Sequence, residues 1–388
     1  MEGDCLMSGI YMDNAATTYP KPESVYLAMD KFNRYMGGNP GRGSNQQSLR
    51  ASSVLLETRQ SLAQLFNIEE CLDIAFTANV TESLNIGLKG VLRPGDHIIT
   101  TSMEHNAVAR PLFVLGKQGI EWTQVTCAAD GTLDPDDMRR AIKPNTRMIC
   151  TLHASNLTGT IMPIKEIGSI ARSAGIIYMV DSAQSAGVLP IDVNEDHIDI
   201  LAFTGHKGLF GPQGTGGIYI NPGIKVKLLK EGGTGSLSEY LEQPDFMPDM
   251  LESGTLNTPG IAGLGAGIAF INEQGMEKIY QHEQKLLTQL IDGLQRIKGI
   301  KLYGPADPKL RTAVLAFNIE GMDCGELSSR LDYEFGIITR SGIHCAPLAH
   351  QTIGSFNSGS CRLSPGYFNT DEDIVNTLQA IETLAMQN

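Results

Sequence analysis

The stretch DILAFTGHKGLFGPQGTGG (199–217) places one lysine, Lys207, among glycines directly after an apolar run. The run DILAF (199–203) is typical of a buried strand. Glycine is frequent in the whole chain, at 42 of 388 residues, against a usual share of about 7%. Glycines clustered after a strand indicate tight turns or a backbone that closely approaches a ligand. Lys207 is therefore a candidate for ligand contact at the end of this strand.

Short apolar runs alternate with helical patterns between about residue 72 and residue 220. The expected strands are 72–77, 97–102, 120–126, 147–154, 176–181, 199–204 and 216–220, and amphipathic stretches at 81–92, 135–142 and 164–174 lie between several of them. This alternation predicts a mostly parallel sheet covered by helices on both faces. In such sheets ligands bind beyond the carboxyl ends of the strands.

The C-terminal third predicts a smaller α/β unit. A region rich in glycine and proline (221–260) comes first, and apolar residues at helical spacing from Ile279 to Ile297 then predict a long helix between two domains. Strands are expected at 314–319, 336–340 and 361–364, with helices at 323–335 and from Thr370, where Asp373 completes a capping box. We expect an N-terminal segment (1–25) that packs with the small domain, a large domain (26–265) and a small domain (266–388).

The composition argues against several classes of function. A net charge of −13 without any block of lysines or arginines makes a nucleic-acid partner unexpected. The seven cysteines form no CxxC pair and no zinc-like Cys/His spacing, which favours a reducing compartment and no metal site. No apolar segment has the length of a signal peptide or a membrane span. The sequence therefore predicts a cytoplasmic protein without a membrane partner.

Polar side chains follow five of the expected strands at the point where each strand ends. They are Thr81, His105, Asn156, Asp181, Gln184, His206 and Lys207. Each has a structural explanation when taken alone: Thr81 as a helix N-cap, Asp181 as a turn cap, the histidines as buried structural groups and Lys207 as a surface lysine. Together they would converge on one crevice, and that convergence indicates a shared ligand.

A pyridine aldehyde with a phosphate would use all of these groups. A lysine amine forms a Schiff base with an aldehyde, and Asp181 suits the ring nitrogen, which needs a carboxylate partner. A helix that begins at Thr81 suits the phosphate, while Gln184 and Asn156 suit the ring hydroxyl and His105 a face of the ring. Neither GxGxxG after a strand nor GxxxxGK[ST] is present, so pyridoxal phosphate explains the pattern better than NAD or ATP. The glycines beside the lysine would let the backbone approach this cofactor.

With these features the chain resembles the cysteine desulfurases and selenocysteine lyases of the class V aminotransferase group. The matching stretches are YMDNAATTYPKP (11–22), TANVTESLN (77–85), MEHNA (103–107), HASNLTGT (153–160), VDSAQSAG (180–187), FTGHKGLFGPQGTGGIYI (203–220), ESGTLNTPG (252–260), RSGIHCA (340–346) and SCRLS (360–364). They occur in the family's order over nearly the whole chain. The resemblance implies an α/β fold of type I among the PLP-dependent transferases, with a large, mostly parallel seven-stranded sheet domain and a smaller C-terminal α/β domain.

The resemblance also implies residue roles around the cofactor. Lys207 matches the Schiff-base lysine, Asp181 the partner of the pyridine nitrogen, and His105 the imidazole stacked on the ring. Asn156 and Gln184 match contacts to the ring hydroxyl or the substrate, and Thr81, Thr204 and His206 match phosphate ligands. Val80 stands where many relatives carry a second hydroxyl, so phosphate binding would depend more on these three residues.

Three further matches concern the substrate and the partner subunit. Arg362 matches the arginine that holds the substrate carboxylate, for which a planar fork is well suited, and Asn14 lies in a matching stretch that would also contact the substrate. Thr255 matches a residue that reaches the phosphate of the neighbouring subunit. The resemblance therefore implies a homodimer with active sites at the interface.

The stretch TRSGIHCAPLAH (339–350) bears on which reaction is catalysed. Cys345 follows a glycine turn and His344 and precedes Ala-Pro, so we expect it on a loop. Free cysteines are most often small buried residues, and we keep that interpretation for the other six. Cys345 matches the family's nucleophile, which must be a reachable thiolate, and we expect Arg340 and His344 to favour that form.

Together these residues predict conversion of L-cysteine to L-alanine. Lys207 would remove the α-proton, Cys345 would attack the substrate sulfur and become a persulfide, and His105 would assist protonation. L-selenocysteine could follow the same route, and the persulfide would pass to an acceptor protein or a small thiol. Two alternatives stay open: a class V aminotransferase or kynureninase-like enzyme in which Cys345 is dispensable, and a PLP-binding sulfur-carrier scaffold without turnover.

Overall fold

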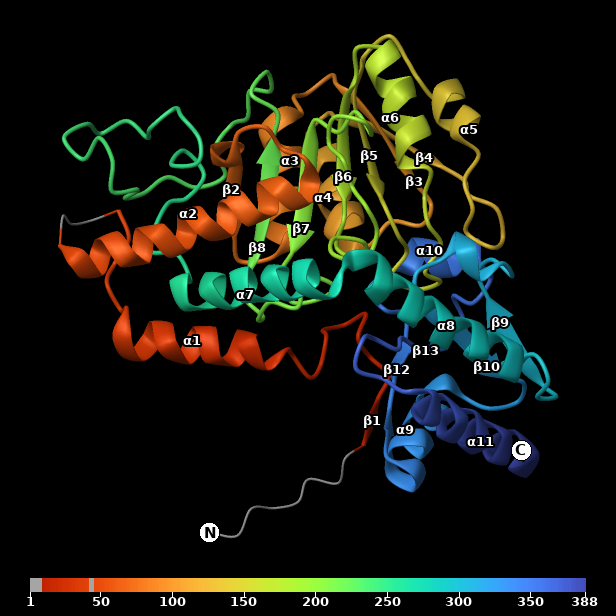
Figure 1. Cartoon of the computed structure of the whole chain (residues 1–388). Coiled ribbons are helices and arrows are strands. Elements are labelled where there is room, and N and C mark those ends of the chain that lie inside the picture. The colour runs from red at the N-terminus through yellow and green to blue at the C-terminus, as the bar shows by residue number, and fades with distance from the viewer. Residues whose placement is uncertain (1–8, 42–44) are drawn as a thin grey trace.

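A computed structural model describes residues 9–41 and 45–388. Its main feature is a seven-stranded sheet with the order β2-β8-β7-β6-β5-β3-β4 (Figure 1). The strands are β2 (Ile74–Thr77), β3 (His97–Thr101), β4 (Glu121–Val125), β5 (Thr146–Leu152), β6 (Ile177–Asp181), β7 (Ile200–Thr204) and β8 (Gly216–Ile220). All pairings are parallel except those of β8, which runs antiparallel to β2 and β7. The expected mostly parallel sheet is confirmed, and all seven expected strands are present.

The sheet separates two apolar cores, because successive side chains of a strand point to opposite faces. In β6, Ile177 and Met179 belong to one core, and Tyr178 and Val180 to the other. Helices α3 (Val80–Val91) and α4 (Asn106–Gly116) cover the first face, and α2 (Gln46–Phe66), α6 (Ile164–Ser173) and α7 (Thr258–Gln274) cover the second (Figure 1). The sequence reasoning missed α4, which contains Pro111, and α5 (Pro135–Arg140) ends earlier than expected.

The glycines that follow β7 pack against other parts of the protein. A Cβ at Gly205 would lie 2.1 Å from Thr215 Oγ1, and a Cβ at Gly208 would lie 2.6 Å from the carbonyl oxygen of Ala186. Contacts this short are not sterically possible, so protein packing alone requires glycine at these positions. The sequence predicted instead that the glycines serve close approach to a cofactor, and that explanation is not needed here.

The C-terminal part of the chain forms a second sheet and a third apolar core. Its antiparallel strands, in the order β12-β13-β10-β9, are β9 (Ile300–Tyr303), β10 (Leu315–Ile319), β12 (Arg340–Gly342) and β13 (Ser360–Leu363). The helices around this core are α8 (Met276–Leu294), α9 (Cys324–Phe335) and α11 (Asp371–Gln387). The expected capping box of Thr370 and Asp373 is present at the start of α11.

Three details of this part differ from the sequence-based expectation. Strand β9 was missed, and the expected strand 336–340 is divided between β11 (Ile337–Ile338) and β12. The expected helix over 279–297 is present as α8, which begins directly after Gly275, the residue with a φ of 86° that ends α7. Helix α8 ends at Leu294, so Ile297 lies beyond it although it packs against the same core.

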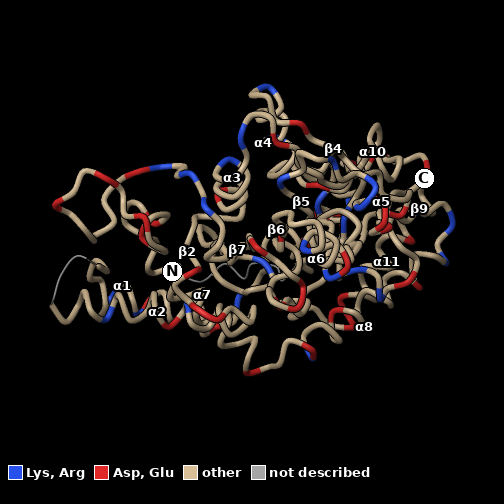
Figure 2. Tube along the Cα trace, turned by 90° about the horizontal axis from the view of Figure 1, so that it is seen from above, with Lys and Arg blue, Asp and Glu red and all other residues tan. Residues whose placement is uncertain are grey.

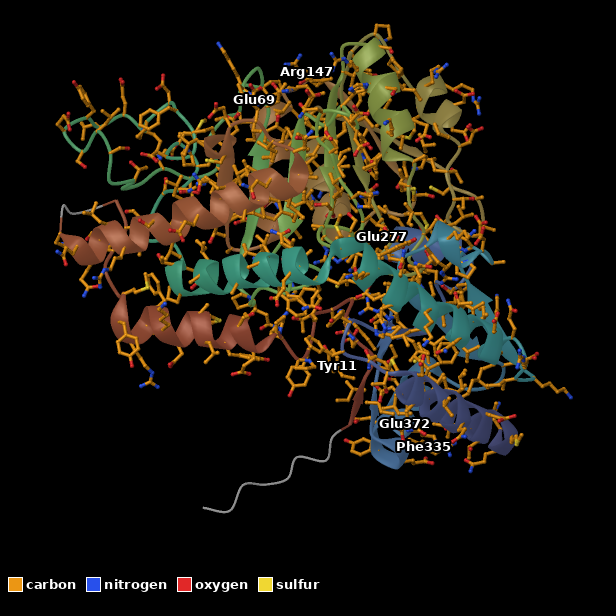
Figure 3. The ribbon with its side chains drawn as sticks, viewed as in Figure 1. Tyr11, Glu69, Arg147, Glu277, Phe335 and Glu372 are labelled. Atoms are coloured by element: carbon orange, nitrogen blue, oxygen red, sulfur yellow. The ribbon has the colours of Figure 1, made fainter. Side chains whose placement is uncertain are left out.

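The N-terminal segment connects the two sheets. Strand β1 (Ile10–Tyr11) pairs in parallel with β11, while the hydroxyl of Thr18 donates to the carbonyl oxygen of Lys207 at 2.8 Å. Figure 3 shows Tyr11 and Phe335 at the end of the molecule opposite Arg147, which lies near the start of β5. The carboxyl ends of the parallel strands therefore face the smaller sheet. Helix α1 (Glu23–Tyr35) follows and packs along α7 (Figure 1).

After β8 the chain forms an extended lobe with neither helix nor strand over residues 221–257, and this lobe lies beside α2 in Figure 1. Acidic and basic residues are interspersed along the described part of the trace (Figure 2). Among the described helices, none combines the length and apolar character needed to cross a membrane.

Candidate active site

Lys207 lies in the loop after β7, where the large sheet faces the smaller one. It lines a narrow pocket together with Asn14, Gln184, Glu283 and Gly366. These residues come from the N-terminal segment, the loop after β6, helix α8 and the turn after β13. The pocket therefore collects groups that are far apart in the sequence, as the convergence of strand ends predicted for Gln184 and Lys207.

Lys207 and Asp181 form the electrostatic centre of the site. Burial lowers the pKa of Lys207 to about 8, although the charge of Asp181 works in the opposite direction. Asp181 ends β6 and accepts a hydrogen bond from the backbone N–H of Ala183 at 2.9 Å. Burial raises the pKa of Asp181, while the Ala183 N–H and Lys207 oppose that shift. Asp181 thus caps its turn and also acts electrostatically on Lys207.

His105 is both the N-cap of α4 and a neutral imidazole beside the charged groups. Its Nδ1 accepts from the backbone N–H of Ala107 at 3.0 Å. Burial lowers the pKa of His105 to about 4, and Lys207 and Arg340 add to the effect. Because Nδ1 is an acceptor, the proton of the neutral ring lies on Nε2.

Arg362 on β13 is held between two elements. Its Nη1 donates to the backbone oxygen of Asn156 at 2.9 Å, and its Nη2 donates to a carboxylate oxygen of Asp13 in an ion pair of which Arg362 is buried and Asp13 partly exposed. Burial lowers the pKa of Arg362, which the charge of Asp13 opposes. The resemblance implied that this fork holds a substrate carboxylate, and in the structure both of its Nη atoms have partners within the chain, Asn156 and Asp13. Sequence reasoning missed Asp13, and the only available signal was its place in the matching stretch YMDNAATT.

The Cys345 loop is joined to the ends of the large sheet's strands. Cys345 lies between β12 and α10 (Pro347–Thr352) and is exposed. Its backbone oxygen accepts from the N–H of Asn106 at 2.8 Å, and the backbone oxygen of His344 accepts from Asn156 Nδ2 at 2.8 Å. Burial lowers the pKa of His344 to about 3, so His344 does not carry the positive charge expected beside the thiol.

The other cysteines agree with the interpretation as buried residues, with one exception. Cys127, Cys150, Cys324 and Cys361 are buried, and Cys71 is partly exposed. Cys5 lies outside the described residues. Cys345 is therefore the exposed thiol of the described chain.

The expected phosphate ligands lie around the start of α3 and the end of β7. Asn79, not Thr81, is the N-cap of α3, and its Oδ1 accepts from the N–H of Glu82 at 3.1 Å. Thr81 is the second residue of that helix and is exposed, whereas Thr204 is buried at the end of β7. Lys21 was missed by sequence reasoning: its Nζ donates to the backbone oxygen of His206 at 2.7 Å, and burial lowers its pKa to about 7.

Four buried polar atoms at the site have no hydrogen-bond partner among the described residues. They are Glu104 Oε2, Asn156 Oδ1, His206 Nδ1 and Arg362 Nε. Buried polar atoms in native proteins are nearly always hydrogen-bonded, so this cluster is suited to a polar ligand. A cofactor with a phosphate, a ring nitrogen, a ring hydroxyl and an aldehyde matches acceptors and donors of this kind together with an amine of lowered pKa. The residues present fit pyridoxal phosphate.

The remaining predicted residues divide into two groups. Gln184 Nε2 donates to the backbone oxygen of Ala15 at 3.0 Å, and Asn14 Nδ2 donates to the backbone oxygen of Ser364 at 3.0 Å. Both residues line the Lys207 pocket, but these bonds fasten the N-terminal segment, so the amide of Asn14 is not free. Thr255 is exposed and lines a separate pocket beside α2. Within one chain the structure does not bring Thr255 to Lys207.

The family model of the class V aminotransferases matches residues 10–376. The chain therefore belongs to the class V aminotransferase family, and the expected family is confirmed. A probable cysteine desulfurase from Methanothermobacter thermautotrophicus is 36% identical, over 98% of this chain and 96% of the relative. A probable cysteine desulfurase from Pyrococcus abyssi is 35% identical, over 97% and 94%. Within the family, the chain is thus similar over nearly its whole length to proteins named as cysteine desulfurases.

Solved structures give the same result for the fold. The apo structure of a cysteine desulfurase from Thermococcus onnurineus NA1 aligns with a TM-score of 0.92 at 33% identity, over 98% of this chain and 95% of that one. The expected fold of the PLP-dependent transferases is therefore confirmed. Members of this family depend on pyridoxal phosphate, which agrees with the fit of the site residues.

Proposed function

We propose that this protein is a PLP-dependent cysteine desulfurase that converts L-cysteine to L-alanine and stores the sulfur as a persulfide on Cys345. The observation that carries the proposal is the attachment of the exposed Cys345 loop to Asn106 and Asn156. Asn106 follows His105, and Asn156 contacts Arg362 through its backbone oxygen. A loop that carries an exposed thiol and is fastened to the neighbours of His105 and Arg362 is what a desulfurase needs and an aminotransferase does not.

When bound, pyridoxal phosphate supplies an electron sink for the carbanion that forms at the substrate's α-carbon. Lys207 would bind the cofactor and, when free, act as the base, because a lysine with a pKa of about 8 is partly neutral near neutral pH. Asp181 would accept the hydrogen bond of the ring nitrogen. Arg362 would hold the substrate carboxylate with Nε, which has no partner among the described residues. His105 would assist the protonation of the product through its Nε2–H group.

Cys345 would perform the sulfur transfer. Its thiolate attacks the substrate sulfur, an S–S bond forms, and the bond between the substrate's β-carbon and its sulfur breaks. The electron pair of that bond stays with the β-carbon, which gains a proton, so carbon is reduced while the transferred sulfur is oxidised to the persulfide level. The sum is L-cysteine plus thiol giving L-alanine plus persulfide, with protons conserved. L-selenocysteine would follow the same route, and an acceptor protein or a small thiol would take the sulfur.

The direct test measures alanine and sulfide released from L-cysteine in the presence of a reducing thiol. We expect the wild-type protein to release both in equal amounts, Lys207→Ala to release neither, and Cys345→Ala to lose sulfide release while keeping cofactor binding. Cys361→Ala, which changes a buried thiol on β13, is the matched control. A keto acid as the product, or full activity in Cys345→Ala, would contradict the proposal.

We also propose that the active protein is a cytoplasmic homodimer in which Thr255 completes the phosphate site of the partner. Thr255 is exposed outside the Lys207 pocket, and the lobe of 221–257 carries exposed apolar residues such as Tyr240, Leu241 and Phe246. Exposed apolar groups of this kind are typical of interaction surfaces. The six described cysteines are free thiols, which supports a reducing compartment.

A mixed dimer tests the role of Thr255. Thr255→Ala and Lys207→Ala chains should each be defective alone, because each homodimer has two damaged sites. When the two are mixed, one site receives both native residues, so activity should return to at most half of the wild-type value. If mixing restores nothing while dimers form, Thr255 does not act across the interface.

A further inference from the structure

The backbone that carries Cys345 has an unusual conformation. His344 and Cys345 have φ values of 52° and 55°, so two consecutive residues with side chains are left-handed. This conformation is uncommon outside glycine and persists only where the surrounding structure holds it. The bonds from Asn156 and Asn106 hold the two carbonyl groups, and the imidazole of His344 is held from a different direction.

A chain of hydrogen bonds runs from Ser355 to Arg340 through two buried histidines. Ser355 Oγ lies 2.7 Å from His350 Nδ1, and His350 Nε2 lies 3.3 Å from His344 Nδ1. His344 Nε2 lies 3.2 Å from the backbone oxygen of Arg340. The two rings are nearly parallel, with an interplanar angle of 10°. His350 is fully buried, so this chain is shielded from water.

The direction of each bond follows by elimination. The backbone oxygen of Arg340 can only accept, so His344 Nε2 must donate and the Nδ1 of the neutral ring must accept. His350 Nε2 must then be the donor to His344, which leaves His350 Nδ1 as the acceptor for the hydroxyl of Ser355. Burial lowers the pKa values of His344 and His350 to about 3 and about 4, so both rings are neutral near pH 7.

We propose that Ser355 and His350 are positioning residues that act through His344 to hold Cys345 in place for its attack on the substrate sulfur. The inference rests on the proposed function. Ser355 fixes the tautomer of His350, and His350 fixes the orientation of the His344 ring. The His344 ring in turn donates from Nε2 to the backbone oxygen of Arg340 and so closes the turn. These bonds keep the backbone at His344 and Cys345 in its left-handed conformation, and this conformation determines the direction in which the Cys345 side chain leaves the backbone. A displacement of a reacting group by about 1 Å can cost about a hundredfold in rate.

Three substitutions of His350 separate positioning from packing. Glutamine places an N–H group where His350 Nε2 lies and can keep the bond to His344. Asparagine places an oxygen where Nδ1 lies and keeps only the bond from Ser355, while alanine keeps neither. His97→Ala is the matched control, because His97 is also fully buried and bonds two threonine hydroxyls, but at the opposite end of β3.

The assay is steady-state turnover of L-cysteine by the cofactor-loaded protein, with kcat and KM determined separately. We expect His350→Ala and His350→Asn to lose about tenfold or more in kcat with KM nearly unchanged, and His350→Gln to stay within about threefold of wild type. Ser355→Ala removes only one hydroxyl group and is the variant to use if the His350 variants do not fold. It should lose about fivefold in kcat because the His350 tautomer is no longer fixed. Cofactor binding should be unchanged in all of them.

Several results would overturn the inference. They are a normal kcat in His350→Asn or Ser355→Ala, an equal loss in His350→Gln and His350→Ala, or an equal loss in His97→Ala. A wild-type protein that makes no alanine from L-cysteine would instead refute the proposed function. The two failures are distinguishable because the first leaves wild-type turnover intact.

Discussion

The lowered pKa of Lys207 predicts how fast the protein without cofactor captures pyridoxal phosphate at each pH. Only the neutral amine can attack an aldehyde. Because burial brings the pKa of Lys207 from 10.5 to about 8, about a tenth of the molecules carry the neutral amine at pH 7, compared with roughly three in ten thousand for an ordinary lysine. The loading rate should therefore rise about tenfold per pH unit below pH 8 and become constant above it.

The measurement is stopped-flow absorbance of the cofactor band after mixing with cofactor-free protein from pH 6 to pH 10. The reaction of N-acetyl-lysine with pyridoxal phosphate in the same buffers corrects for the ionisation of the cofactor itself. In Asp181→Asn the carboxylate that raises the pKa of Lys207 is gone, so the midpoint should move below that of the wild type. A rate that still rises steeply between pH 9 and pH 10 would refute the reasoning, because it is the profile of an unperturbed lysine.

Two further predictions concern buried charges near the site. Asp13→Asn removes the ion-pair partner of the buried guanidinium of Arg362, so the free energy of unfolding measured by urea denaturation should fall by about 3 kcal/mol. Adding Arg362→Met to this variant should recover part of the lost stability. An unchanged urea midpoint in Asp13→Asn would contradict this reasoning. Burial raises the pKa of Glu283 from 4.5 to about 8, so between these values the native state binds more protons than the unfolded state, and stability falls as pH rises. Glu283→Gln should therefore be more stable than wild type at pH 7, by up to about 3 kcal/mol, and equally stable near pH 4.5. Thermal unfolding of both proteins at the two pH values measures this difference. If the stabilities of the variant and the wild type change with pH in parallel, Glu283 does not titrate as a buried group.

The sequence was sufficient for the residues that a single strand positions. Each parallel strand ends at the same edge of the sheet, so His105, Asp181 and Lys207 could be assigned to one crevice from the order of apolar runs alone. The N-cap of α3 was assigned to the wrong residue because Asn79 and Thr81 are both good capping residues, and only the backbone geometry distinguishes them. The missed helix α4 contains a proline, which counts against a helix in any local pattern.

The contacts that complete the site depend on packing between distant parts of the chain. The partner of Arg362, Asp13, is 349 positions away, and no local pattern reports such a pair. The neutral state of His344 has the same origin, because its pKa is lowered chiefly by burial, which depends on the packing of the whole chain. Sequence reasoning assigned a charge to His344 from its neighbours in the chain, whereas the solvent exposure of the ring decides it.

The position of Cys345 depends both on the local sequence of its loop and on packing against distant parts of the chain. The residue belongs to the loop between β12 and α10, yet the carbonyl groups of the turn are held by Asn106 and Asn156, which follow strands of the large sheet. A displacement of the smaller sheet relative to the large one would therefore break these bonds and release the left-handed backbone at 344–345. The reach of the thiol thus depends on how the two sheets are joined, while the hydrogen bonds from Ser355 to His344 hold the same turn through the imidazole of His344.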